Sequence, residues 1–150
     1  MREGRGDLMS TQRTSSIDRF KALTDDLQKE VHNQAVQELR SQASGLAESI
    51  KAVTPVYAGT PEFGIKPGAL QQSVRAVPDR SKDTVVRVIA GGVATTRTES
   101  GYDYARAVEF GTQKMPAHSF FFPTYRLKKK TMIAAMKRKI AASIKKRSAE

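Results

Sequence analysis

The sequence predicts an α+β fold with a long N-terminal helix, a small antiparallel β-sheet and a long basic C-terminal helix. Apolar residues recur at steps of three and four from Ile17 to Ile50, which is typical of one face of a helix. Residues 83–90 read D-T-V-V-R-V-I-A, a β-branched run that favours a strand. Residues 124–148 contain neither Gly nor Pro and carry apolar residues roughly on one side, which predicts the second helix.

The first residues predict a flexible arm. Residues 1–14 are rich in Gly, Arg, Ser and Thr without apolar periodicity. Ser15 or Ser16 is expected to cap the first helix, and Asp18 in its first turn suits the helix dipole. We therefore expect an arm at 1–14 and one α+β domain at 15–150.

The first helix is about ten turns long, too long for a small sheet alone to cover. We expect its uncovered part to pack on another helix or another subunit. Small residues at 41–47 favour close approach of neighbouring backbone, or a break at Gly45.

Residues 53–68 contain three Pro and three Gly, and this composition excludes a regular element. A loop of this length is usually either disordered or functional. Tyr57, Phe63 and Ile65 are apolar residues by which it could dock on a partner.

A hairpin is expected next. Residues 69–77 are compatible with a helical turn followed by a strand, and the polar turn 78–82 leads into the strand 83–90. Gly91-Gly92 ends the hairpin, and a Thr-rich loop follows at 93–101.

The stretch 104–123, Y-A-R-A-V-E-F-G-T-Q-K-M-P-A-H-S-F-F-F-P, is the centre of the chain. Gly111 permits a turn with φ > 0. Pro123 suits the first position of a helix. Three of the six Phe lie at 120–122, so the core or the main contact surface is expected to pass through them.

Composition excludes several classes of protein. With 150 residues the chain is expected to form one domain, and without Cys it has no disulfide, thiolate zinc site or Cys nucleophile. No apolar run is long enough for a membrane span, and the first residues lack the apolar core of a secretion signal. The modest 39% of hydrophobic residues suggests that elements project from the core or complete it with a partner.

The net charge of +11 is concentrated at one end. Residues 1–113 carry 15 basic and 14 acidic side chains, whereas residues 114–150 carry 11 basic side chains and one acid, Glu150. A block of cations of this kind favours contact with phosphate or with an acidic protein surface. The alternative is a solvated helix face without a partner. Any DNA contact would be nonspecific, because the basic helix has no interleaved aromatics and no Asn or Gln to read bases. The candidate contacts are Lys128, Lys129, Lys130, Lys137, Arg138 and Lys139.

Catalytic chemistry has little support in the sequence. His32 lies outside the apolar stripe and is expected to face solvent. His118 with Glu109 and Asp103 could form an acid–base or metal group, but their spacing matches no such motif. We therefore predict no enzyme, catalytic residue, cofactor or metal site.

The central stretch resembles the signature of a family of small tail-component proteins from long-tailed bacteriophages, found in head-to-tail connection and tail-completion modules. The Pro/Gly-rich segment after the first helix is also similar, at Thr54, Pro55, Gly68, Leu70 and Ser73. The chain departs from that family in its enlarged loop, 56–67, and in Phe121-Phe122, where a shorter apolar pair is usual. The matching signature residues are Tyr104, Ala105, Glu109, Phe110, Gly111, Thr112, Pro116, Ala117, Phe120 and Pro123.

This resemblance implies a structural virion protein of the phage neck or tail, made in the host cytoplasm and acting in head–tail joining or tail completion. It implies a ring of six copies between the connector and the tail tube, with connector or stopper and tail-terminator proteins as neighbours and DNA passing through. Glu109 would then stabilise a turn or make a polar contact between subunits, Gly111 would form the turn, and residues 120–122 would hold the last helix on the sheet. The alternative function is a nonspecific DNA-binding module.

Overall fold

The computed structural model describes residues 6–58, 64–97 and 100–147, and their side chains from residue 16 to 146. They form an α+β fold with a two-stranded antiparallel sheet, as the sequence predicted. In chain order the elements are α1 (Gly6–Val53), α2 (Ala69–Ser73), β1 (Arg75–Pro78), β2 (Val86–Ile89), the 3₁₀ helix η2 (Val93–Thr95), α3 (Tyr104–Phe110) and α4 (Phe121–Arg147).

The first helix is continuous and longer than predicted. It runs through Gly45 without a break and begins at Gly6, so residues 6–14 of the expected arm are helical. Residues 7–14 contain neither Gly nor Pro, and extending an existing helix adds one hydrogen bond for each residue fixed. Propagation therefore outweighs the capping signal at Ser15 and Ser16. Residues 1–5 lie outside the described residues.

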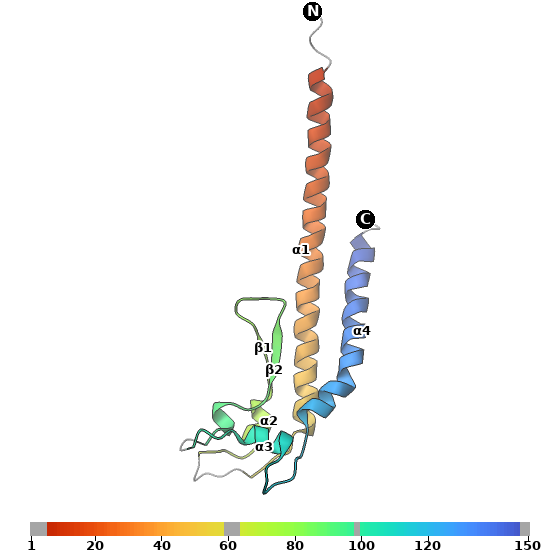
Figure 1. Cartoon of the computed structure of the whole chain (residues 1–150). Coiled ribbons are helices and arrows are strands. Elements are labelled where there is room, and N and C mark those ends of the chain that lie inside the picture. The colour runs from red at the N-terminus through yellow and green to blue at the C-terminus, as the bar shows by residue number, and fades with distance from the viewer. Residues whose placement is uncertain (1–5, 59–63, 98–99, 148–150) are drawn as a thin grey trace, which may run out of the picture.

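α1 is the axis of the molecule (Figure 1). The β1–β2 hairpin lies on one side of it and α4 on the other, and α1 contacts all three elements. α2, α3 and the loops form a base at the C-terminal end of α1. The N-terminal part of α1 projects beyond both the hairpin and the end of α4.

The hairpin is shorter than predicted. β1 pairs with β2 from Arg75 opposite Ile89 to Pro78 opposite Val86. The residues before Val86 belong instead to a turn held by Asp79, whose Oδ1 accepts hydrogen bonds from the Ser81 N–H and hydroxyl. These hydrogen bonds lower the pKa of the Asp79 carboxyl.

His32 is exposed, as predicted, and it connects α1 to the hairpin turn. Its Nε2 lies 2.7 Å from Oδ2 of Asp83. The hydrogen bond from His32 lowers the pKa of the Asp83 carboxyl. His32 is thus a surface contact between two elements of one chain.

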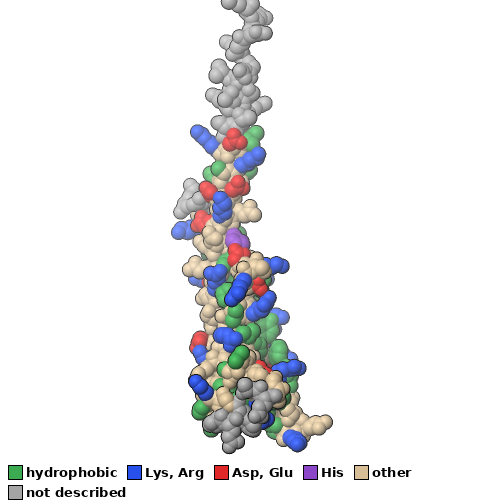
Figure 2. Space-filling model, turned by 90° about the vertical axis from the view of Figure 1, so that its left-hand side faces the viewer, with side chains coloured by type: hydrophobic (Ala, Val, Ile, Leu, Met, Phe, Trp, Pro, Cys, Tyr) green, Lys and Arg blue, Asp and Glu red, His purple; other side chains and the backbone are tan. Residues whose placement is uncertain are grey.

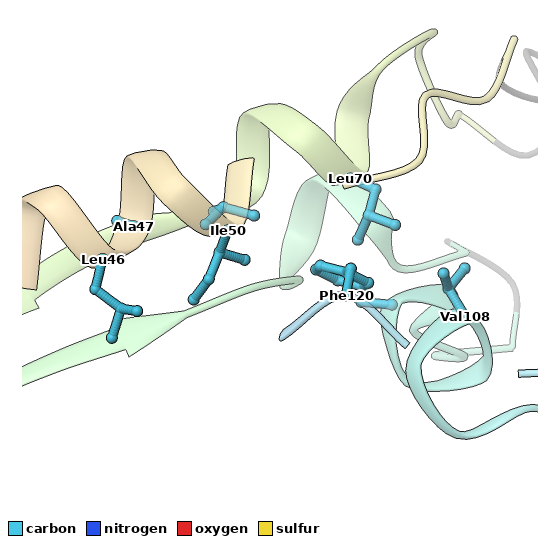
Figure 3. Packing of buried hydrophobic residues seen from close by; sticks show 8 residues of the cluster. Leu46, Ala47, Ile50, Leu70, Val108 and Phe120 are labelled. Carbon is cyan, nitrogen blue, oxygen red and sulfur yellow. The ribbon is translucent and has the colours of Figure 1, made fainter. Parts of the chain in front are cut away.

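The core lies in the base, where the C-terminal end of α1 meets α2, α3 and the start of α4. Figure 3 shows Phe120 near Leu70 and Val108, with Ile50 on the side of α1. Ile50 and Leu70 have no exposed surface. This cluster joins residues from both ends of the chain, so α1 and α4 are held at one end by a common core.

The two described ends of the Pro/Gly-rich loop meet. The Gly68 N–H donates to the Tyr57 carbonyl at 3.0 Å. Ile65 is buried and the Tyr57 ring packs edge-on against Tyr104 at 6.4 Å between centroids. Ile65 is therefore not available to dock on a partner as the sequence suggested, because the chain itself covers it. Phe63 lies outside the described residues.

Replacing Ile50 by alanine should lower the free energy of unfolding by about 2–5 kcal/mol, because the side chain is fully buried in the shared core. The matched control is Ile133→Ala on α4, which is 44% exposed and should lose clearly less. Urea unfolding followed by circular dichroism gives both values. Equal losses in the two variants would show that the base is not the core.

Candidate functional site

The stretch 104–123 forms a junction at the base that directs α4 back along α1. α3 carries its first part, a turn follows at Gly111, and α4 begins at Phe121. We call residues 103–123 the α3–α4 junction. The ten signature residues from Tyr104 to Pro123 lie here, whereas the predicted cationic contacts lie farther along α4.

Glu109 caps the first turn of α4. Its Oε2 accepts hydrogen bonds from the backbone N–H groups of Phe120 at 2.8 Å and Phe121 at 2.9 Å, and its Oε1 accepts one from Phe122 at 3.0 Å. The residue is buried, with 6% of its surface exposed. A buried carboxylate is tolerated when it is hydrogen-bonded and lies at the positive end of a helix dipole. Glu109 therefore fixes the position of α4 relative to α3.

Pro123 completes this arrangement, although not at the predicted position. α4 begins at Phe121, so Pro123 is the third helical residue and Phe121 and Phe122 belong to the helix. The first four N–H groups of a helix have no partner within it. Three of them bond to Glu109, and the fourth does not exist because the residue is proline. The prediction that Pro123 starts the helix was wrong because the distant carboxylate takes the N–H groups that precede it.

Gly111 makes the turn, as predicted, with φ 75°. A Cβ at this position would lie 2.9 Å from the Ala117 nitrogen and 3.0 Å from the Met115 carbonyl oxygen. The turn is closed by the Thr112 N–H, which donates to the Met115 carbonyl at 2.8 Å. Both the backbone angle and the lack of space therefore require glycine here.

Asp103 caps the start of α3. Its Oδ1 accepts from the Ala105 N–H at 2.9 Å and from the Thr95 hydroxyl at 2.7 Å, and its Oδ2 accepts from the Gly92 N–H at 3.0 Å. A Cβ added to Gly91 would lie 2.5 Å from Oδ2 of Asp103, so this position has no room for a side chain. Asp103 thus connects η2 and the end of the hairpin to α3.

The three consecutive phenylalanines have different surroundings. Phe120 is in the core, Phe121 packs partly against it, and Phe122 is 43% exposed. Phe122 pairs with Phe110, which is 64% exposed, at 5.9 Å between ring centroids. We call Phe110 and Phe122 the exposed aromatic pair. The expectation that all three hold α4 on the sheet is therefore wrong for Phe122, because N-cap and first-turn residues point in different directions around the helix.

Three cavities adjoin the junction. Asp103, Phe110 and Gly111 border the first, of about 430 Å³, and there are two others. One of about 220 Å³ lies between β2, α3 and the start of α4, and the exposed aromatic pair lies on its wall. The other, of about 470 Å³, is bordered by Tyr57, Tyr104 and Met115. Burial raises the pKa of the Tyr104 phenol. Among the described residues the lining of the larger cavity is aromatic and aliphatic apart from Arg97 and Thr112, and it includes no carboxylate or histidine.

The structure does not support the possible acid–base group of Asp103, Glu109 and His118. Asp103 and Glu109 accept backbone hydrogen bonds that cap two helices, and His118 is exposed. Within the described part of the chain, no three His, Cys, Asp or Glu side chains are grouped to hold a metal. Thr112 and Pro116 are exposed residues of the turn region.

The predicted cationic residues all lie on α4 and are all exposed. Lys129 extends over the Tyr125 ring, with Nζ 5.8 Å from its centroid. The full set is Lys128, Lys129, Lys130, Lys137, Arg138 and Lys139.

Comparison with protein-family models, curated proteins and solved structures found no match. None of the described helices has the length and apolar character needed to span a membrane.

Replacing Glu109 by glutamine should lower the free energy of unfolding by about 1–3 kcal/mol, because the charged acceptor is lost and one oxygen becomes a donor facing N–H groups. The matched control is Glu48→Gln, an exposed carboxylate 3.6 Å from Lys51, which should change stability by less than about 0.5 kcal/mol. Chemical unfolding checks both, and a loss for Glu109→Gln no larger than the control would contradict the capping role.

Two glycine substitutions should have opposite effects. Gly111→Ala should destabilise the chain by more than about 1 kcal/mol because of its positive φ and the nearby backbone atoms. Gly45→Ala should stabilise it by about 0.5–1 kcal/mol, since an added Cβ meets nothing within 4 Å in the middle of α1. Thermal unfolding measures both signs, and a stabilising Gly111→Ala would refute the account of the turn.

Proposed function

We propose that this chain is a structural protein of the neck or tail of a long-tailed bacteriophage and acts in head–tail joining or tail completion by assembling into a ring. Its neighbours would be copies of itself and connector, stopper, terminator or tube proteins of the particle. The chain would work through its contacts and not through catalysis.

The observation that carries the proposal is the apolar surface that the chain leaves uncovered. On the projecting part of α1, Ile17, Phe20 and Leu23 are 53%, 70% and 64% exposed. They lie on the stripe that continues toward the base, where α4 and the hairpin cover it. We call these three residues the α1 stripe. An exposed row of large apolar side chains is costly unless another surface covers it.

The exposed aromatic pair at the other end of the molecule supports the same proposal. Phe110 and Phe122 lie at the base, whereas the α1 stripe lies far along the projecting helix. Two separate apolar surfaces on one subunit suit a heterologous contact, in which one surface of a subunit meets a different surface of the next. Such contacts form a closed ring when the rotation between subunits closes.

The chemistry of the junction also supports a structural role. The two carboxylates in it each accept several backbone or hydroxyl hydrogen bonds and hold α3 and α4 in place. The resemblance to phage tail-component proteins covers this junction, where the signature residues Glu109, Gly111 and Phe120 have a structural explanation.

The test combines assembly with location. Sedimentation of the purified chain should show a ring-sized oligomer, and the double variant Phe20→Gln with Leu23→Gln should sediment as a smaller species with unchanged helix content. The expected effect follows from removing apolar contacts without lowering helix propensity. Antibodies against the chain should label the head–tail junction of phage particles that contain it.

The matched control is Ala22→Gln with Lys29→Gln, two exposed positions on the opposite side of α1, which should leave assembly intact. A chain that is monomeric at every concentration and labels no particle would overturn the proposal. Equal loss of assembly in the control would show that the α1 stripe is not the contact.

A further inference from the structure

α4 has two unlike faces. Toward α1 it presents Met132, Met136 and Ile140, which are half-buried. The opposite side is exposed along the whole helix and is rich in cations. The helix carries ten Lys and Arg and no acid between residues 121 and 147. The cations of α4 therefore have no acids among them. On the face that Figure 2 shows, by contrast, blue cationic and red acidic side chains lie interspersed.

The outer side has an ordered pattern. Ala134 and Ala141 are exposed and lie seven residues apart along its centre. Four exposed cations flank this row of small residues, two on each side, and we call them the outer cations: Lys130 and Lys137 on one side, Arg138 and Lys145 on the other. On each side the two are seven residues apart, or about 10 Å along the axis. The small side chains between them allow a rod-like partner to approach the backbone of α4 closely.

The outer cations have no anionic partner within the described part of the chain. Ion pairs between described side chains include His32 with Asp83, Lys51 with Glu48 and Arg87 with Asp79, and none of these involves an outer cation. Four like charges on one helix face repel one another, and an anionic partner removes that cost.

Other cations of α4 are placed differently. Lys129 lies over the Tyr125 ring, and by helical spacing Lys128 and Lys139 lie at the edge next to the row that faces α1. The six cations proposed from the sequence therefore do not form one surface. Lys130, Lys137 and Arg138 belong to the outer face, and Lys145 joins them.

We propose that the outer cations form a binding surface for the phosphate backbone of double-stranded nucleic acid, without sequence preference. A duplex offers phosphates along a rod, which matches two rows of cations along one face of α4. α4 contains no Asn or Gln, and its outer face has no aromatic residue, so it has no means of reading base edges or stacking on bases. This inference does not depend on the proposed ring.

The test is fluorescence anisotropy of a labelled random-sequence 20-base-pair duplex, titrated with the full chain at several salt concentrations. Each neutralised phosphate contributes about 0.9 to the slope of log K against log salt. A variant with Lys130, Lys137, Arg138 and Lys145 all changed to Gln should flatten the slope by about 3–4. At the lowest salt it should bind at least about tenfold more weakly than the unchanged chain.

The matched control removes the same charge from elsewhere by changing Lys21, Lys29, Lys66 and Lys114 to Gln, all exposed positions outside α4. The control variant should bind the duplex with an affinity within about threefold of the unchanged chain's. Its slope of log K against log salt should differ by no more than about 1. Absence of binding at low salt, or equal losses in both variants, would overturn the proposal. It would also be overturned if poly-glutamate of equal charge competed as well as unlabelled duplex, since an acidic protein surface would then be the partner. Sedimentation of the same variants reports assembly separately, so failure of nucleic-acid binding is distinguishable from failure of the ring.

Discussion

The fold depends on one carboxylate. Glu109, at the end of α3, accepts the N–H groups of three consecutive residues at the start of α4, and Pro123 removes the need for a fourth acceptor. This places the start of α4 against α3, and Phe120 then enters the core beside Leu70. Because α4 is held at its beginning, its remaining length lies along α1 and exposes its cationic side. The orientation of the longest basic segment is thus set by local hydrogen bonding at the base.

A molecule built in this way is closely packed at one end and exposes its side chains along the rest of its length. The core and both helix caps lie at the base, whereas the α1 stripe and the outer cations lie on parts that nothing else in the described chain covers. An arrangement of this kind suits a protein that is completed by its neighbours. The apolar surfaces would meet protein, and the cationic side of α4 would remain open to a polyanion.

The sequence predicted the elements better than their ends. Periodicity was enough for α1, α4 and the hairpin, because each has a long or distinctive pattern of apolar residues. It could not place the start of α1, since helix propagation through residues 7–14 leaves no compositional signal. Nor could it assign Glu109, because that cap joins residues that are eleven to thirteen positions apart and local capping patterns span only three. The available signal was indirect: a Glu two residues before a glycine, and a Pro at the start of the next predicted helix. The separation of Phe120 from Phe122 was also hidden, since three identical residues give no sign of which one faces the core.

Amide hydrogen exchange at the start of α4 tests the central claim most directly. The N–H groups of the N-cap and first-turn residues of a helix usually exchange quickly, because they lack acceptors. We predict slow exchange at Phe120, Phe121 and Phe122 in the unchanged chain, and a joint loss of protection at all three in Glu109→Gln, with the middle of α4 less affected. Fast exchange at these three amides in the unchanged chain, or protection that survives Glu109→Gln, would contradict the account.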